Sequence, residues 1–277
     1  MSRLTGRGGQ QDLSGILWSV ARVLVVVALF VVALVPALFA LSMSVRSAAN
    51  FYNPIWIPED PTFEWYRQSW QSTAPLLENS YLRALGSTIL TLLITLPASY
   101  AFARRDFAHK SLLFYAVVGV LLFPVIIAAI PITVTFIDIG LSDNIVGLWL
   151  IDLVFLVPFT VFLMRDYLSA LPANIEEAAQ VYGCTPFTAF VRVILPLSVP
   201  GILAVSFFAF VISWNEFFFG LLLTVDSAKP AIASLNEAVS ADASLQQGVV
   251  MARTVLISLP PALMYLFARK SLTQTFQ

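Results

Sequence analysis

The chain has 277 residues, of which 59% are hydrophobic and only 11% are charged, against about 25% charged residues in an ordinary soluble domain. Too few polar side chains are left to cover a soluble surface, so this composition excludes a soluble globular domain. A single cysteine (Cys184) excludes an intrachain disulfide, and a single histidine (His109) excludes the usual Cys/His metal sites. The net charge of −1 gives no reason to expect nucleic acid as a partner.

Long apolar segments predict an all-α, polytopic membrane protein, because about 20 apolar residues are needed to cross the hydrocarbon core of a bilayer. Four segments carry no charge, and two others are interrupted only by Asp152 and by Arg253. The first is too long for the core of a signal peptide, so we expect it to be retained. No second domain is indicated within 1–277. The six predicted spans cover about 16–43, 82–104, 111–137, 145–167, 197–223 and 247–268.

The distribution of basic residues predicts that both termini face the cytoplasm. Cytoplasmic segments of membrane proteins carry an excess of Lys and Arg. This orientation leaves only five of the fifteen basic residues outside, namely Arg46, Arg67, Arg83, Lys229 and Arg253. The chain is therefore expected to be a multi-pass membrane protein with its N- and C-terminal ends on the cytoplasmic side.

The segment between the first two spans, about 46–80, is rich in proline and aromatic residues, among them Trp65, Tyr66 and Trp70. We expect it to be an external loop. Tyr and Trp favour the headgroup region of a bilayer, so the loop either lies on the membrane surface or forms a docking surface for an extracytoplasmic partner.

The segment between spans four and five, about 172–196, carries signals for two short helices. Asn174, followed by Glu177 three residues later, predicts a capped first turn. Gly183 is suited to the left-handed conformation that ends a helix, and Thr185 before Pro186 predicts the N-cap of a second helix. The sequence therefore predicts a rigid helix–turn–helix that projects into the cytoplasm.

Small residues beside a carboxylate mark the first of these helices. Glu177, Ala178 and Ala179 form a face that lets the backbone of another protein approach closely. The alternative is an ordinary amphipathic surface helix, because Glu and Ala are simply good helix formers.

The spacing of this segment resembles the cytoplasmic signature of permease subunits from ATP-binding-cassette importers. In that signature Glu-Ala-Ala is followed after three residues by Gly, and nine residues later by an aliphatic residue, any residue and Leu-Pro. Here Glu177 to Ala179 are followed by Gly183 and then by 193–196 at the same spacing. Tyr182 stands where the family commonly has Asp.

Flanking residues resemble the carbohydrate branch of the family, in its maltose-type small permease. The resemblance covers about 58–269, and the tail after Arg269 lacks the glycine-rich ending of that branch. The landmarks are Asn79-Ser80, the stretch 98–104, Pro158-Phe159 and the stretch 213–217.

This resemblance implies the permease subunit of a binding-protein-dependent importer for a sugar, such as a di- or oligosaccharide or a sugar derivative, that works by alternating access. It also implies a location in a prokaryotic inner or plasma membrane. The implied partners are a second permease, which the family suggests is a different chain, two cytoplasmic ATPase subunits that bind ATP and Mg, and an extracytoplasmic solute-binding protein. The chain itself would be non-catalytic and hold no cofactor. The residues that would couple it to the ATPase are Glu176, Glu177, Ala178, Ala179, Gly183, Leu195 and Pro196.

Polar residues inside the predicted spans are candidates for the transport pathway, because ionisable groups in a membrane are costly and commonly functional. Asp152, Glu216 and Arg253 fall in the outer halves of their spans and could form one cluster, and Asn215 is next to Glu216. The alternative is a packing network, with Arg253 reaching the headgroups. Pro124 and Pro131 predict a bent third span.

Two other functions stay open at this point. A permease for a polyamine, phosphate or an osmolyte would share the signature but not the carbohydrate landmarks. A channel or secondary transporter would suit six spans with buried charge, but it would leave the signature unexplained. No nucleophile–base pair or phosphate-binding loop indicates an enzyme.

Overall fold

The computed structural model describes residues 8–51, 56–240 and 247–275, and within these ranges the chain is almost entirely helical, with one isolated bridge between Arg46 and Pro61. Four helices are long and apolar enough to cross a bilayer: α1 (Gly8–Ser44), α2 (Glu64–Arg104), α5 (Ile145–Ala170) and α12 (Gln247–Thr275). Counting each of two bent helix pairs as one span raises the number to six. The prediction of an all-α fold is therefore confirmed, with four to six candidate membrane spans among the described residues.

The first bent pair lies where the third span was predicted. Helix α3 (Lys110–Gly119) and a short 3₁₀ turn, η2 (Val120–Leu122), meet α4 (Val125–Asp138) at an angle of 92°. The break is at Pro124, which has an extended backbone and no N–H to continue a helix, whereas Pro131 lies inside α4. The bend was predicted, but its sharpness was not.

The second bent pair joins the segment that resembles the permease signature to the fifth predicted span. Helix α6 (Asn174–Val181) is followed by α7 (Pro186–Ala189), the π-helical turn η3 (Phe190–Ile194) and α8 (Leu195–Leu197). The α7–α8 unit meets α9 (Val199–Asn215) at 76°. A second break at Glu216 and Phe217 then separates α9 from α10 (Phe218–Leu223).

Two regions differ from the prediction. Helix α2 begins at Glu64, so residues 64–80, which were expected in a loop, are helical, and only the turn η1 (Ala48–Asn50) and the neighbouring residues connect it to α1. The early start has a packing reason, because Ser69 is buried and its hydroxyl donates to the Val249 carbonyl on α12. Helix α11 (Ala231–Ser240), between α10 and α12, was not predicted.

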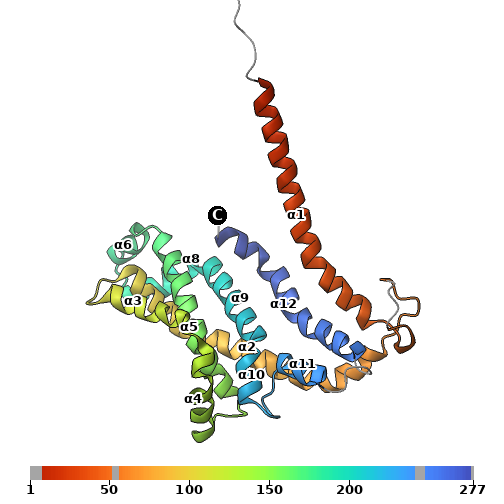
Figure 1. Cartoon of the computed structure of the whole chain (residues 1–277). Coiled ribbons are helices and arrows are strands. Elements are labelled where there is room, and N and C mark those ends of the chain that lie inside the picture. The colour runs from red at the N-terminus through yellow and green to blue at the C-terminus, as the bar shows by residue number, and fades with distance from the viewer. Residues whose placement is uncertain (1–7, 52–55, 241–246, 276–277) are drawn as a thin grey trace, which may run out of the picture.

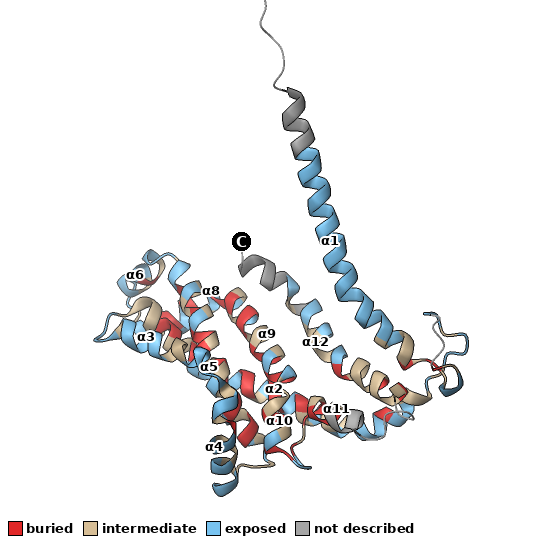
Figure 2. Ribbon diagram, viewed as in Figure 1, coloured by how far each residue is buried: buried red, intermediate tan, exposed pale blue. Residues whose placement is uncertain are grey.

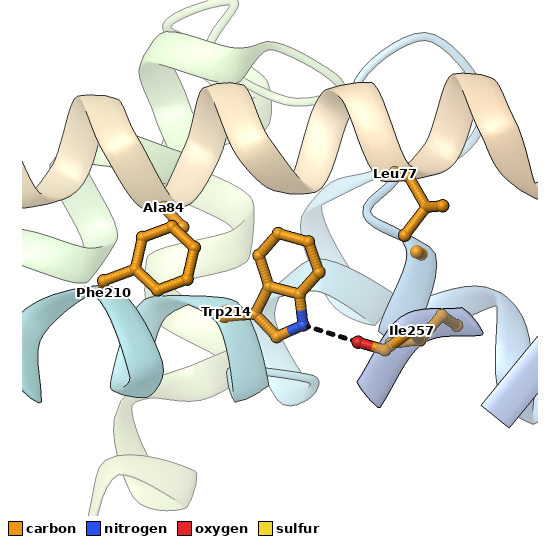
Figure 3. Packing of buried hydrophobic residues seen from close by; sticks show 6 residues of the cluster. Leu77, Ala84, Phe210, Trp214 and Ile257 are labelled. Carbon is orange, nitrogen blue, oxygen red and sulfur yellow. Dashed lines mark hydrogen bonds between the residues drawn. The ribbon is translucent and has the colours of Figure 1, made fainter. Parts of the chain in front are cut away.

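Helix α2 lies at the centre of the molecule and packs against α5, α9 and α12 (Figure 1). Figure 3 shows one part of this core, where Trp214 of α9 lies between Leu77 and Ala84 of α2 and donates its ring N–H to the Ile257 carbonyl of α12 at 3.1 Å. A second buried cluster joins α2, α5, η3 and α9 near α6, and it includes Tyr100, Met164, Phe190 and Ile194.

Helix α1 extends away from the other helices, and its described side chains are exposed along most of its length (Figure 2). Only its C-terminal end is anchored. There, the Ser44 hydroxyl bonds the Tyr66 hydroxyl at 2.8 Å, and the Trp65 ring N–H donates to the Arg46 carbonyl at 2.7 Å. Exposed apolar residues on every side of a long helix fit a lipid environment.

Candidate functional site

The turn between α6 and α7 is held by backbone geometry that only some residues can adopt. Gly183 has φ +89°. The Cys184 N–H donates to the Ala179 carbonyl and the Gly183 N–H donates to the Gln180 carbonyl, which is the pattern of a Schellman motif. Thr185 caps α7, since its hydroxyl accepts the Thr188 N–H at 3.2 Å, and Pro186 is at the first helical position. The predicted left-handed conformation of Gly183 and the predicted N-cap at Thr185 are confirmed.

The predicted cap of α6 is wrong. The residue at the N-cap position is Ala173, which has helical backbone angles and no capping side chain, and Asn174 already belongs to the helix. The Ala173 carbonyl accepts the N–H groups of Glu176 and Glu177 at 3.0 and 3.2 Å. The first turn therefore begins one residue earlier than a capping box with Asn174 would place it.

Helix α6 is held instead by an ion pair between the buried Glu176 carboxylate and Arg105, which directly follows α2 and is 37% exposed. The Glu176 carboxylate accepts hydrogen bonds from the Tyr100 hydroxyl at 2.6 Å, from the Arg105 guanidinium at 2.8 Å and from the Gln180 amide at 3.3 Å. Arg104 also donates to the Leu171 carbonyl at 2.6 Å. We call Glu176, Tyr100 and Arg105 the α2–α6 latch.

The opposite side of α6 and its turn is open. Glu177 and Ala178 are exposed, and so are the apolar side chains of Val181, Tyr182 and Phe187. Tyr182, which departs from the family pattern, is thus part of this exposed apolar surface. Below the surface, Phe190 and Ile194 are buried in the cluster with Met164, and Leu195 and Pro196 form α8 at the base of α9. The structure therefore connects the loop to α2, α5 and α9 through buried contacts.

A second polar centre lies between α2, α5 and the α9–α10 break. Arg83 donates to both oxygens of Asp152, at 3.0 and 2.6 Å, and to the Glu216 carboxylate at 2.5 Å and the Glu216 carbonyl at 3.0 Å. Asp152 also accepts the hydroxyls of Ser87, at 2.8 Å, and Ser213, at 2.5 Å. We call these five residues the Arg83 network.

The structure confirms only part of the predicted intramembrane cluster. Asp152 and Glu216 come together, but Arg83, which was assigned to the outside, is the cation between them. Arg253 lies elsewhere and donates to the Ser72 hydroxyl at 2.9 Å. The Asn215 side chain is exposed and donates to the Val211 carbonyl at 2.8 Å, one turn back on its own helix.

Asp143 ties together two connecting segments, the loop before α5 and the loop after α10. Partial burial alone would raise the pKa of Asp143. Its carboxylate, however, accepts hydrogen bonds from the N–H groups of Val225, Ser227 and Ala228 and from the Ser227 hydroxyl, and these hold the pKa of Asp143 well below the usual range. Asp143 itself has φ +51°. The loop between α4 and α5 is thereby fastened to the loop after α10.

We expect Asp143→Asn to lower the thermal midpoint of the purified permease at neutral pH. Because the folded pKa is depressed, the stabilisation is complete above the unfolded pKa of about 3.9 and is lost as the pH falls through the folded value. The gap between wild type and variant should therefore be constant from pH 7 to pH 5 and shrink below about pH 4. A gap that grows in acid would contradict this role, and differential scanning fluorimetry across pH measures it.

Among the described residues, no group of three or more His, Cys, Asp or Glu side chains is arranged to hold a metal ion.

Comparison with known proteins gives consistent matches. The family described as binding-protein-dependent transport system inner membrane component matches residues 73–272. The diacetylchitobiose uptake system permease protein NgcG of Streptomyces coelicolor is 30% identical over 85% of this chain and 80% of its own length. The trehalose transport system permease protein SugB of Mycobacterium tuberculosis is 30% identical over 82% and 85%.

A solved structure shares the fold. It is that of a bacterial ABC transporter involved in the import of the acidic polysaccharide alginate, and it aligns with a TM-score of 0.79 at 20% identity, over 97% of this chain and 99% of the other.

Proposed function

Because the chain belongs to the family of binding-protein-dependent transport system inner membrane components, we propose that it forms one half of the translocation pathway of an ATP-driven importer that works by alternating access. The cargo is a sugar, in agreement with the diacetylchitobiose and trehalose permeases among its relatives. Within that class, we propose a di- or oligosaccharide or a sugar derivative.

The observation that carries the mechanism is the fixed loop from α6 to α8. We propose that α6 is the coupling helix and that its exposed surface, with Glu177, Val181 and Tyr182, sits in a cleft of a cytoplasmic ATPase subunit. A flexible loop would absorb the motion of the ATPase pair. The glycine turn, the capped α7 and the buried contacts of Phe190 and Ile194 favour transmission of that motion to α5 and α9.

The proposed assembly follows from this role. It contains a second permease chain, two ATPase subunits that bind ATP and Mg, and an extracytoplasmic solute-binding protein. In this assembly six spans cross a prokaryotic inner membrane. The α3–α4 pair forms the third span and α9 with α10 forms the fifth, and both termini are in the cytoplasm. The chain itself binds no cofactor and catalyses no reaction in this proposal.

Reconstitution tests the proposed function directly. Proteoliposomes that contain both permeases and the ATPase subunits should accumulate trehalose or diacetylchitobiose. Accumulation should require ATP on the side of the membrane that holds the ATPase subunits, and the solute-binding protein on the opposite side. Uptake without the ATPase subunits would indicate a channel or secondary transporter. ATP-driven uptake of a polyamine, phosphate or an osmolyte, with none of the sugars, would replace the sugar assignment.

Gly183→Val is expected to uncouple transport from ATP hydrolysis. A Cβ at Gly183 meets nothing within 4 Å, so the effect comes from the positive φ, which costs roughly 1–2 kcal/mol for a residue with a Cβ. Gly183→Asn is the matched control, because Asn tolerates this conformation. The valine variant should insert normally but lose most uptake per ATP hydrolysed, and the asparagine variant should keep most of it. Normal uptake in the valine variant would count against coupling through this turn.

A further inference from the structure

The Arg83 network holds more negative than positive groups. One guanidinium faces two carboxylates, while Ser87 and Ser213 contribute only hydroxyls. The side chains of Arg83 and Asp152 are 1% and 2% exposed, whereas that of Glu216 is 18% exposed. The excess negative charge therefore reaches a surface at Glu216.

The Glu216 carboxylate is held in a fixed position. It accepts the N–H groups of Phe219 at 2.9 Å and Gly220 at 3.3 Å at the start of α10, and Arg83 binds both its carboxylate and its main-chain carbonyl. Oxygen Oε1 accepts only the Phe219 N–H among the hydrogen bonds of the described residues, so it keeps capacity for another donor. A group held in this way can bind a ligand without reorganising.

A cavity of about 350 Å³ lies beside this carboxylate. Its lining residues are Val125 and Ile126 of α4, Phe155 of α5, Phe218 and Phe219 of α10, and Glu216, which is the one polar side chain among them. The volume and the mainly apolar lining with a single placed polar group are typical of small-molecule sites.

The membrane position of Glu216 decides what the cavity can contain. Glu216 is the one charged residue in the apolar stretch 199–223, which includes α9 and α10. Arg83 and two N–H groups replace part of the hydration of this carboxylate, but Oε1 keeps acceptor capacity that lipid chains could not satisfy, which is unfavourable. The partly exposed side of Glu216 therefore favours water or a polar ligand in the cavity over lipid chains.

We propose that this cavity is a contact subsite for uncharged, hydroxyl-bearing cargo, in which the Glu216 carboxylate accepts a cargo hydroxyl and Arg83 is the positioning residue that holds it there. The assignment rests on the proposed function and adds the site and the charge class of the cargo. The phenyl rings of Phe155 and Phe218 supply apolar surface for the C–H faces of a sugar ring. The excess negative charge disfavours sugars that carry a carboxylate.

Cysteine labelling tests the electrostatic part of the proposal without knowledge of the natural cargo. Ile126→Cys is introduced in a Cys184→Ser background of the full importer, held with ATP and vanadate. Ile130→Cys, one turn further along α4 and similarly exposed but not part of the lining, is the matched control. Rates of reaction are measured with cationic 2-(trimethylammonium)ethyl and anionic 2-sulfonatoethyl methanethiosulfonate.

The thiol of the Ile126→Cys variant should react with both reagents. We compare the ratio of the labelling rate with the cationic reagent to the labelling rate with the anionic reagent. This ratio should be about tenfold higher in the Ile126→Cys variant than in the Ile126→Cys/Glu216→Gln variant. The thiol of the Ile130→Cys variant should show no such dependence on Glu216. If the thiol at position 126 is as inert as a lipid-facing one, the cavity is not open to water and the proposal fails. If Glu216→Gln leaves the ratio unchanged, Glu216 is not the acceptor.

A matched pair of sugars tests the cargo class and needs no change at Glu216. Glucose and glucuronate differ only in a carboxylate at C6, and both are offered at the same high concentration. Glucose should slow the labelling of the Ile126→Cys variant severalfold more than glucuronate does, with no effect on the Ile130→Cys variant. Equal protection by both, or protection by neither, would overturn the assignment. ATP-driven uptake by the wild-type importer is measured separately, and its absence would count against the proposed function rather than against the cavity.

Discussion

Arg83→Met should remove most of the folded permease from the membrane. The substitution keeps an unbranched apolar side chain but leaves Asp152 and Glu216 as adjacent carboxylates without their cation, in a site where Arg83 and Asp152 are almost completely buried. Removing one partner of a buried ion pair typically costs about 3–5 kcal/mol, which is a large part of the stability of a domain. The yield of folded protein after detergent extraction, together with its thermal midpoint, measures the effect.

Two comparisons separate the loss of charge pairing from other effects. Arg67→Met removes an ion pair with Glu64 on the same helix, but the Arg67 side chain is 77% exposed, so we expect almost no change in the yield or the thermal midpoint. The triple variant Arg83→Met/Asp152→Asn/Glu216→Gln removes the unpaired charges, and it should recover much of the yield that Arg83→Met loses. If the triple variant is as unstable as the single one, packing rather than charge makes Arg83 necessary.

The features that sequence reasoning predicted correctly are those with local causes. The positive φ of Gly183 and the cap at Thr185 depend on residues within one turn, and the break at Pro124 depends on a missing N–H at that residue. The predicted cap at Asn174 was wrong although it is also local. The chain has a helical conformation already at Ala173, so the Asn174 side chain no longer precedes the first turn.

The features that were missed depend on contacts between distant residues. Arg83 is 69 positions from Asp152 and 133 from Glu216, and Glu176 is 71 from Arg105. A count of basic residues placed Arg83 outside because it lies at the edge of a charge-free run. A usable signal was present, however: two carboxylates in apolar spans need a cation, and Arg83 shares a helix face with Ser87, whose hydroxyl also bonds Asp152.

Glu176→Ala is expected to reduce the amount of sugar taken up per ATP hydrolysed by about tenfold. The reason is that the buried Glu176 carboxylate accepts hydrogen bonds from Tyr100 of α2 and from Arg105, which directly follows α2, as well as from Gln180 of its own helix. Without the α2–α6 latch, α6 still has its own turn at Gly183, but it can shift relative to α2 when the ATPase moves. Binding of the ATPase should persist, since Glu177, Val181 and Tyr182 are unchanged on the exposed side. Coupled measurement of uptake and phosphate release in proteoliposomes gives the ratio.

Glu177→Ala is the matched control, because the same kind of side chain is removed one position along α6, where it is exposed. Any loss in this variant should arise from weaker binding of the ATPase and should be reversed by excess ATPase subunits, whereas the Glu176→Ala defect should persist under the same excess. The conservative variant Tyr100→Phe, which removes one donor to Glu176 and keeps the ring packed against Phe190, should have a smaller effect of the same kind. If excess ATPase restores Glu176→Ala fully, then Glu176 acts in docking, and the attachment of α6 to α2 is not what transmits the motion.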